Sequence, residues 1–341
     1  MSLTFKSKVK LFTHLDLDGI GSEVVGRLAF PLIDVTIVRN PKDASEKVKE
    51  FLDNQEYLEY DHIFITDISV SDEVAMEINE LGLYETMKFT LLDHHGTADY
   101  LNKYPWAHVI EKSPIGKEAG THLFFKHLTN NGFFKHEIYR DGLEVFVEKV
   151  RRYDCWEWKD KYNDLEALDL NTLFFLIGRD KFVNQFLNKF LGLDICIVRE
   201  GSWKDMFDDT DKMVIKIEND KKESYINKKE KQMFQTKLLG LPVGVVFAEQ
   251  YTSELGNVLA ERNGKLAYIV IIDIGNSKVS YRTTRNDINL GKDVAGKFGG
   301  GGHPKASGSE FSTSIPKLAF NLIFNIGFTS KLVKLFDKTG K

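Results

Sequence analysis

Residues of the types that bind metal ions are concentrated at three places in the first third of the chain. Residues 14–18 carry a histidine and two aspartates at alternate positions, a single aspartate stands at 67, and residues 93–95 read Asp-His-His. A cluster of like charges has to be neutralised, and a divalent cation does this well. The candidate ligands are His14, Asp16, Asp18, Asp67, Asp93, His94 and His95.

Each of these places follows a stretch that predicts a buried β-strand. The apolar or β-branched runs of this part of the chain are 9–13, 34–39, 62–66 and 87–92. The helical patterns between them are 22–29, 44–52 and 72–81. Strands that alternate with helices indicate a parallel sheet. Because ligands bind beyond the carboxyl ends of such strands, we expect the three places to meet at one edge of the sheet.

Taken singly, each candidate has a structural explanation. Asp16 or Asp18 could cap a helix that starts near Gly21, and a lone histidine usually packs or faces solvent. Three strand ends that all carry ligand-type residues favour metal binding instead. Without cysteine in the group, Mn²⁺ or Mg²⁺ is favoured over structural zinc. The set exceeds what one ion needs, which indicates two ions, typically ~3.5–4 Å apart.

The composition is that of a folded globular chain. Its 341 residues are 42% hydrophobic and 28% charged, with a formal net charge of −4, which argues against a disordered, collagen-like or uniformly basic protein. Residues 241–341 hold 13 Lys and Arg against 8 Asp and Glu, so this segment carries +5 and the first 240 residues carry −9. Solvated surfaces alone can differ this much in net charge. The split also suits cation binding by the first 240 residues and anion binding by residues 241–341.

Cysteine use and hydropathy predict a cytoplasmic protein without a membrane partner. The two cysteines, Cys155 and Cys196, make neither a disulfide framework nor a thiolate metal site. The N-terminus has no apolar run of the signal-peptide kind. The most apolar stretch, 268–274, is far too short to cross a bilayer.

The last third of the chain predicts a second α/β domain. Its expected elements are strands at 243–247, 266–274 and 278–283 and a helix at 253–262. Ser253 is the expected cap of that helix, and a Gly-Asn-Ser turn predicts a hairpin. The charged stretch 203–238 that precedes this domain is expected to form a long exposed helix or linker.

A run of four glycines at 299–302 leads into His303. Glycine lets the backbone approach a ligand closely, and amides exposed there can hold an anion. Arg282 precedes the run and suits phosphate through its bidentate geometry. A flexible surface loop is the alternative explanation of the glycines.

These motifs together resemble the DHH phosphoesterase superfamily. The matching segments are 14–22 (HLDLDGIGS), Thr66-Asp67, Asp93-His94-His95, Tyr153-Asp154 and, for the DHHA1 domain that often follows, 299–308 (GGGGHPKASG). They occur in the family's order and span nearly the whole chain. The tight His-X-Asp-X-Asp-Gly spacing is most similar to bacterial oligoribonucleases of the nanoRNase B type, and it weakens a reading as a pAp phosphatase.

The resemblance implies an α/β fold of two domains. A parallel-sheet DHH catalytic domain would occupy 1–200, a helical linker 201–240, and a smaller mixed α/β DHHA1 substrate-binding domain 241–341. The active site would lie in the cleft between the two domains.

The resemblance also implies the roles of individual residues. His14 and Asp16 would hold one metal ion. Asp18, His94 and Asp154 would hold a second, and Asp67 would bridge the two. His95 would face the substrate, and Asp93 would orient a histidine. The implied substrate contacts are His95, Arg282, Gly300, Gly301, Gly302 and His303.

The implied activity is that of a hydrolase of phosphoester bonds. It would be a metal-dependent exonuclease that cuts short single-stranded RNA to mononucleotides, with water activated by two divalent ions, Mn²⁺ before Mg²⁺. Hydrolysis of a cyclic dinucleotide or of pAp is left open, as is a non-catalytic nucleotide-binding module. The expected partner is a short RNA or a small phosphorylated nucleotide, and a homodimer is left open.

Other residues keep two interpretations. Trp106, Trp156 and Trp158 could stack on bases or pack the core. Arg151 and Arg152 could reach phosphate or complement the end of a helix. The histidines outside the motifs are expected to be structural: His62, His108, His122, His127 and His136.

Overall fold

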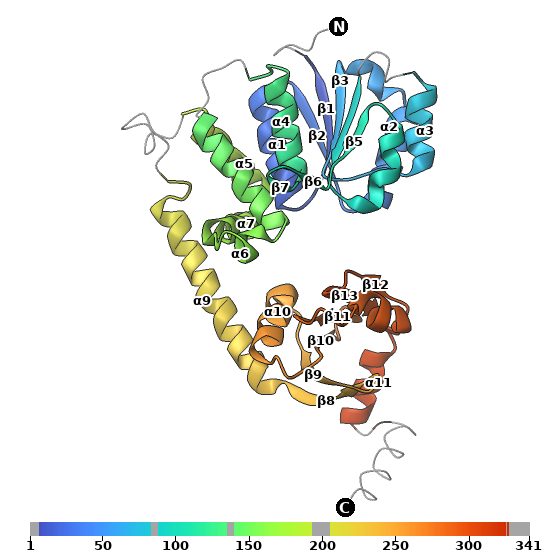
Figure 1. The fold of residues 1–341 in the computed structure, drawn as a ribbon, viewed down its shortest axis with the longest axis vertical. Helices are drawn as coiled ribbons and strands as arrows, with labels where there is room; N and C mark the ends of the chain where they lie inside the picture. Colours follow the sequence, from blue (N-terminus) through green and yellow to red (C-terminus); the bar gives the residue numbers. More distant parts are fainter. Residues whose placement is uncertain (1–6, 83–87, 135–139, 193–204, 325, 327–341) are drawn as a thin grey trace, which may run out of the picture. The chain divides into compact units, whose positions relative to one another are not determined.

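The computed structural model describes residues 7–82, 88–134, 140–192, 205–324 and 326. The chain divides into two compact units, Met1–Lys216 and Ile217–Lys341 (Figure 1). His136 and Cys196 lie outside the described residues. The roles predicted for 1–200, 201–240 and 241–341 remain a prediction.

The first unit is built on a sheet of five parallel strands in the order β2-β1-β3-β4-β5. The strands are β1 (Val9–His14), β2 (Ile33–Val38), β3 (His62–Thr66), β4 (Phe89–Asp93) and β5 (Ala107–Val109). Strands β3 and β4 are buried along their whole length, as expected where helices cover both faces. The strand order reverses between β1 and β3, and such a switch point is where sheets of this kind bind ligands.

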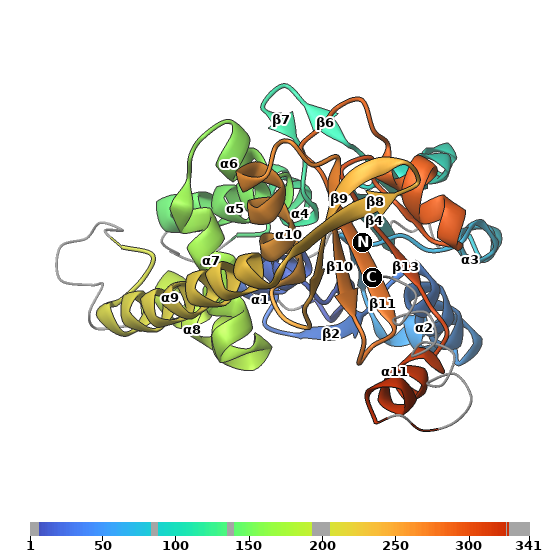
Figure 2. The same cartoon turned by 90° about the horizontal axis from the view of Figure 1, so that it is seen from below.

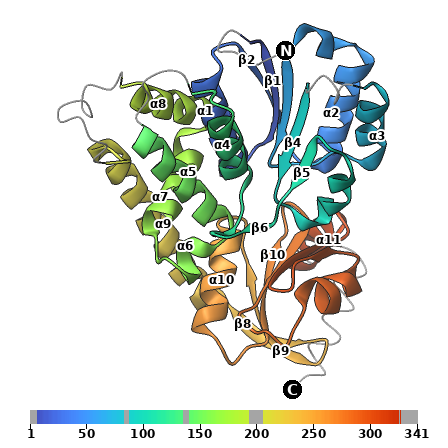
Figure 3. The ribbon, with the colours of Figure 1, turned by 45° about the horizontal axis from the view of Figure 1, so that its top comes forward.

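Helices cover both faces of this sheet (Figures 1 and 3). One face packs against α1 (Leu17–Ala29) and α4 (Gly120–Asn130), and the other against α2 (Pro41–Asp53) and α3 (Asp72–Glu80). Four more helices extend the α1 and α4 side: α5 (Arg140–Asp154), α6 (Glu157–Asp160), α7 (Leu165–Ile177) and α8 (Arg179–Phe190). Short elements complete the unit: the 3₁₀ turns at Glu56–Glu59 and Gly96–Lys103 and the hairpin β6 (Lys112–Ser113) and β7 (Gly116–Lys117).

The second unit holds a six-stranded mixed sheet in the order β12-β13-β11-β10-β9-β8 (Figure 2). Its strands are β8 (Phe234–Leu238), β9 (Leu241–Phe247), β10 (Tyr268–Asp273), β11 (Lys278–Arg282), β12 (Gly301–Gly302) and β13 (Ala306–Glu310). Its helical elements are α10 (Thr252–Arg262), short turns at Leu290–Val294 and Ala295–Phe298, and α11 (Ile315–Ile323). Only β9 and β10 pair in parallel, and β10 and β11 form the predicted hairpin.

The helix α9 (Asp209–Gln232) occupies most of the charged stretch 203–238, but the predicted helix does not continue to its end. Residues Phe234–Leu238 form β8 and pair with β9 in antiparallel fashion. Leu239 and Gly240 both have left-handed φ angles, +52° and +80°, which two-residue hairpin turns require. Within the described residues, no helix has the length and apolarity needed to cross a bilayer.

The prediction that Ser253 caps α10 is wrong. The helix begins at Thr252, its N-cap residue is Tyr251, and no side chain caps it. The Ser253 hydroxyl instead accepts a hydrogen bond of 3.0 Å from Nη2 of Arg282. A tertiary contact with the neighbouring strand has therefore replaced the local cap.

His127, in the last turn of α4, gives the first unit a pH-dependent stability. Its ring meets Phe64 edge to face at 5.7 Å, and burial, with a smaller contribution from His108, lowers its pKa to about 4. The unfolded value is about 6.5, so its contribution is complete above that pH and is lost as the pH falls from 6.5 to 4. Between pH 7 and pH 5 this loss amounts to about 2 kcal/mol.

We therefore expect His127→Phe to lose less stability than the unchanged protein between pH 7 and pH 5. Urea unfolding at the two pH values measures the difference directly. Equal acid sensitivity of the two proteins would show that His127 is already solvated in the folded state.

Candidate metal centre

The carboxyl ends of three neighbouring strands bring the predicted ligands together. His14 is the last residue of β1, Asp67 follows β3 directly, and Asp93 is the last residue of β4. Asp154 comes from elsewhere in the sequence, as the last residue of α5. The convergence that the sheet topology predicts is thus present, at the switch point between β1 and β3.

The loop after β1 is folded tightly so that its aspartates point inward. Asp16 is the N-cap of α1 and accepts a hydrogen bond of 3.1 Å from the Gly19 amide. The Thr13 hydroxyl donates to the Gly19 carbonyl at 3.0 Å. A Cβ on Gly19 would lie 2.0 Å from the His14 carbonyl oxygen, so only glycine allows this close approach.

One group of candidate ligands is formed by His14, Asp16 and Asp67, whose ligand atoms lie within 4.8 Å of one another. Nδ1 of His14 lies 2.8 Å from Oδ2 of Asp16 and 3.8 Å from Oδ2 of Asp67. The other ring nitrogen, Nε2, lies 3.3 Å from the carbonyl oxygen of Arg39. Donation from Nε2 to that carbonyl leaves Nδ1 with the lone pair that a metal needs.

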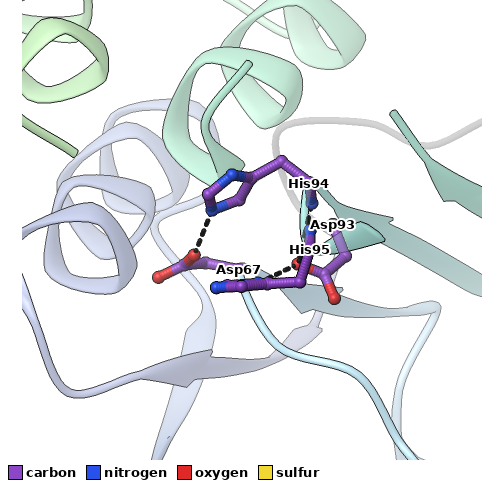
Figure 4. Close-up of side chains that lie close together, drawn as sticks. All are labelled: Asp67, Asp93, His94 and His95. Carbon is purple, nitrogen blue, oxygen red and sulfur yellow. Dashed lines mark hydrogen bonds and ion pairs between the residues drawn. The ribbon is translucent and has the colours of Figure 1, made fainter. Parts of the chain in front are cut away.

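A second group consists of Asp18, His94 and Asp154, again within 4.8 Å. Nε2 of His94 lies 3.6 Å from Asp18 and 3.5 Å from Asp154. The same atom lies 3.2 Å from Oδ1 of Asp67 (Figure 4). Burial lowers the pKa of His94 despite the surrounding carboxylates, which favours the neutral imidazole that binds metals.

Asp67 belongs to the first group through Oδ2, and its other oxygen, Oδ1, lies beside His94 of the second group. It is 1% exposed, and its Oδ2 has no hydrogen-bond partner among the described atoms. Burial and then the charges of Asp18, Asp16 and Asp154 raise its pKa well above the usual value. Its φ of +58° is left-handed, a strained conformation that is concentrated at functional sites.

The pKa of Asp154 is raised by the same causes, burial first and then the neighbouring charges of Asp18 and Asp16. A buried carboxylate oxygen without a donor and several carboxylates that repel one another fit a site for divalent cations. The residues present therefore suit the metal ions that the motifs imply.

Asp93 and His95 are hydrogen-bonded to each other, and together with Asp67 and His94 they form a third group whose ligand atoms lie within 4.8 Å of one another (Figure 4). Asp93 is fully buried, and its Oδ1 lies 2.7 Å from Nδ1 of His95. The hydrogen bond to Asp93 raises the pKa of His95 to about 9 against the opposing effect of burial. Half of the His95 side chain stays exposed, so its Nε2 remains available to a ligand.

Residues that the sequence analysis did not single out hold the candidate ligands in place. The Ser69 hydroxyl donates to Oδ2 of Asp93. The backbone amides of Gly120 and Thr121 donate to the two carboxylate oxygens of Asp18 at 2.6 and 2.8 Å. Ser69 lies in the loop after β3, and Gly120 and Thr121 are the first two residues of α4, so no local pattern marks them as partners of Asp93 and Asp18.

The predicted substrate contacts of the second unit lie on β11 and at β12, two strands that β13 separates in the sheet. Arg282 ends β11, and its guanidinium donates to the Tyr281 carbonyl and to Ser253. Among the described carboxylates, none forms an ion pair with Arg282, so its charge is unpaired. His303 is exposed at the turn between β12 and β13.

The glycines of the run differ in what requires them. A Cβ on Gly300 would lie 2.0 Å from the Gly308 carbonyl oxygen, and one on Gly302, whose φ is +131°, would lie 2.8 Å from Cα of Ser307. Gly301 has open space around it. Close packing of backbone therefore accounts for glycine at 300 and 302, and at 301 it does not.

The structure shows the surroundings of the arginines and tryptophans for which the sequence left two interpretations. Arg151 is 0% exposed and pairs with Glu148 and Glu157, and Arg152 pairs with Glu148 and Asp164. Both arginines are held by carboxylates of their own unit. Among the tryptophans, Trp106 is buried in the core, whereas Trp156 is 44% exposed and packs beside Trp158.

Comparisons with known proteins agree with this fold. No protein-family profile matches the chain. The chain is 36% identical over 319 residues to the oligoribonuclease NrnB of Bacillus subtilis, which covers 93% of this chain and 76% of that protein.

Solved structures with the same fold have low sequence identity to this chain. The exonuclease RecJ bound to manganese has a TM-score of 0.53 and 13% identity, over 92% of this chain and 88% of that one. The pGpG-specific phosphodiesterase PggH from Vibrio has a TM-score of 0.50 and 15% identity, over 93% and 98%.

The parallel sheet, the carboxylate-rich strand ends and this likeness define a DHH-family phosphoesterase, and the chain belongs to that family. Within the family it is similar to the NrnB oligoribonucleases, as the tight spacing of residues 14–18 indicates. The resemblance inferred from the motifs is confirmed.

Proposed function

We propose that this protein is a metal-dependent phosphodiesterase that hydrolyses short RNA oligonucleotides to mononucleotides. The observation that carries the proposal is the position of Asp67 between the two ligand groups, with one buried oxygen toward each. The 36% identity to an oligoribonuclease over most of both chains supports the choice of substrate.

These distances support the following assignment of metal ligands. His14 and Asp16 would hold one divalent ion, Asp18, His94 and Asp154 a second, and Asp67 would bridge them. Two Mn²⁺ ions bound there would polarise a phosphoryl oxygen and lower the pKa of a water molecule. The chain's own contribution is to keep the carboxylates converging on one site, with Oδ2 of Asp67 left without a hydrogen-bond partner among the described atoms.

Groups that are not proposed ligands would act on the phosphate. Asp93 fixes His95 through Nδ1, which leaves Nε2 to donate a hydrogen bond to a phosphoryl oxygen. Arg282, with no ion-pair partner among the described carboxylates, supplies a cation for the phosphate of a bound nucleotide. In the second unit, the amides around Gly301 and the side chain of exposed His303 would contact a nucleotide together with Gly300 and Gly302.

A substrate panel with Mn²⁺ tests the proposal. It should contain RNA dinucleotides, including the linear dinucleotide pGpG, together with longer RNA, single-stranded DNA, pAp and cyclic dinucleotides. We expect the dinucleotides and very short RNA to be cleaved fastest, and we expect EDTA to stop the reaction. Fastest turnover of pAp or of a cyclic dinucleotide would replace the proposed substrate with another of the same chemistry.

The non-catalytic alternative predicts a different set of results. A nucleotide-binding module would bind short oligonucleotides without releasing mononucleotides, at any Mn²⁺ concentration. Chromatographic separation of products distinguishes the two, and absence of hydrolysis from all substrates with Mn²⁺ bound would rule out the proposed enzyme.

A further inference from the structure

We infer that Gly120, the first residue of α4, is a positioning residue that sets the geometry of Asp18 and Asp67 together. The inference rests on the proposed metal site and adds to it a residue that is not itself a ligand. Gly120 acts in two ways: its amide holds one of the carboxylates, and its lack of a side chain makes room for the other.

The first action is hydrogen bonding to Asp18. Asp18 is 1% exposed, so its carboxylate can be stabilised only by groups of the protein or by a bound cation. The amides of Gly120 and Thr121 each donate to one of its oxygens, at 2.6 and 2.8 Å. Hydrogen bonds to an ionised carboxylate are strong, and the two together fix the plane of the carboxylate.

The Thr121 hydroxyl adds a third contact, because it donates to the backbone carbonyl of Asp18. Helix α4 thus holds both the side chain and the backbone of Asp18 across a separation of about one hundred residues. The amino end of a helix also carries a partial positive charge. It is here directed at the most crowded group of carboxylates in the described part of the chain.

The second action is steric. A Cβ on Gly120 would lie 2.4 Å from Cβ of Asp67 and 2.7 Å from its Cα. The atoms in the way include backbone, so they cannot rotate aside, and any side chain at 120 must push Asp67 or α4 outward. Asp67 already has a left-handed φ of +58°, and it is the residue whose two oxygens face the two ligand groups.

Gly120→Ala tests this inference, with Gly26→Ala as the matched control. Gly26 is also a buried glycine of a helix in the first unit, but its Cβ would meet only side-chain atoms of Ile33, Phe124 and Leu11. The measurements are the affinity for Mn²⁺ by titration calorimetry and the rise in Tm that Mn²⁺ produces. Neither measurement needs a substrate.

We expect Gly120→Ala to weaken Mn²⁺ binding by about 10–100-fold, the usual effect of losing a residue that orients a ligand. Gly26→Ala should lower Tm equally with and without Mn²⁺ and keep the affinity of the unchanged protein. If Gly120→Ala binds Mn²⁺ as tightly as Gly26→Ala does, the inference is wrong. If the unchanged protein itself does not bind Mn²⁺, the proposed function fails instead.

A second pair of variants keeps the test decisive if Gly120→Ala does not fold. Thr121→Val has nearly the same shape as the original and removes only the hydroxyl that donates to the Asp18 carbonyl, whereas Thr121→Ser retains it. We expect weaker Mn²⁺ binding in Thr121→Val and recovery in Thr121→Ser. Equal affinity in both variants would show that the Thr121 hydroxyl takes no part in positioning Asp18 for the metal.

Discussion

Asp67→Asn should abolish both hydrolysis and the stabilisation by Mn²⁺, and it should make the metal-free protein more stable. Without metal, the buried Asp67 carboxylate is opposed first by burial and then by the charges of Asp18 and Asp16. Asparagine keeps the shape, tolerates the left-handed backbone and removes that repulsion. It also removes a negative ligand that faces both groups.

Thermal unfolding in EDTA and in Mn²⁺ separates these effects. For a unit of about this size, each 1 kcal/mol of stability changes Tm by ~2–4 °C. Mn²⁺ at 100 times its Kd should stabilise the unchanged protein by about 2.7 kcal/mol and Asp67→Asn hardly at all. In EDTA, the variant should have the higher Tm.

Asp211→Asn is the matched control, because Asp211 is also a buried aspartate of the first unit but pairs with the buried cation of Lys189 at 3.3 Å. Its loss should lower Tm with and without Mn²⁺ and leave the metal-induced rise intact. If metal-free Asp67→Asn is less stable than the unchanged protein, the charges of Asp18 and Asp16 do not destabilise the Asp67 carboxylate. A full Mn²⁺ response in that variant would exclude Asp67 as a ligand.

Arg151→Met should cost the protein about 3–5 kcal/mol of stability, the usual effect of removing one member of a buried ion pair. The Arg151 side chain is fully buried and donates to Glu148, to Glu157 and to the Lys117 carbonyl. It thereby joins α5 to β7 and α6. Methionine fills similar space but leaves that carbonyl without its donor and leaves Glu157 with the Lys117 amide at 3.4 Å and Lys161 at 3.7 Å.

Arg152→Met provides the comparison for this prediction. Arg152 is 25% exposed, and each of its partners retains another cation, Arg151 for Glu148 and Lys149 for Asp164. We expect a loss of about 1 kcal/mol or less. Urea unfolding in EDTA measures both variants under conditions in which metal binding plays no part. Equal losses would mean that burial of Arg151 contributes nothing beyond a surface ion pair.

The local sequence pattern was sufficient to predict the parallel sheet and the strand ends that carry the candidate metal ligands. The apolar runs before His14, Asp67 and Asp93 alternate with amphipathic helices, and only a parallel sheet buries such strands on both faces. Once the strands are parallel, their carboxyl ends share one edge. The meeting of residues far apart in sequence therefore follows from the pattern of strands and helices.

Where a prediction depended on a single local preference, tertiary contacts overrode that preference. Ser253 has the type and place of a helix cap but accepts a hydrogen bond from Arg282 instead. Phe234–Leu238 continues a charged helical stretch yet forms a strand, because the left-handed turn at Leu239 and Gly240 returns the chain onto it. In each case the contact with a tertiary partner is more favourable than the locally preferred structure.

The sequence by itself determined the class of the protein, the strand ends that carry its chemistry and the types of its candidate ligands. Spacing could not reveal that Asp67 has an oxygen toward each group, that Arg151 is wholly paired, or that α4 begins against Asp18 and Asp67. These features depend on contacts between residues that are from 6 to 102 positions apart in the sequence. Only packing of the helices onto the sheet fixes them, because distance and burial arise when the chain is folded.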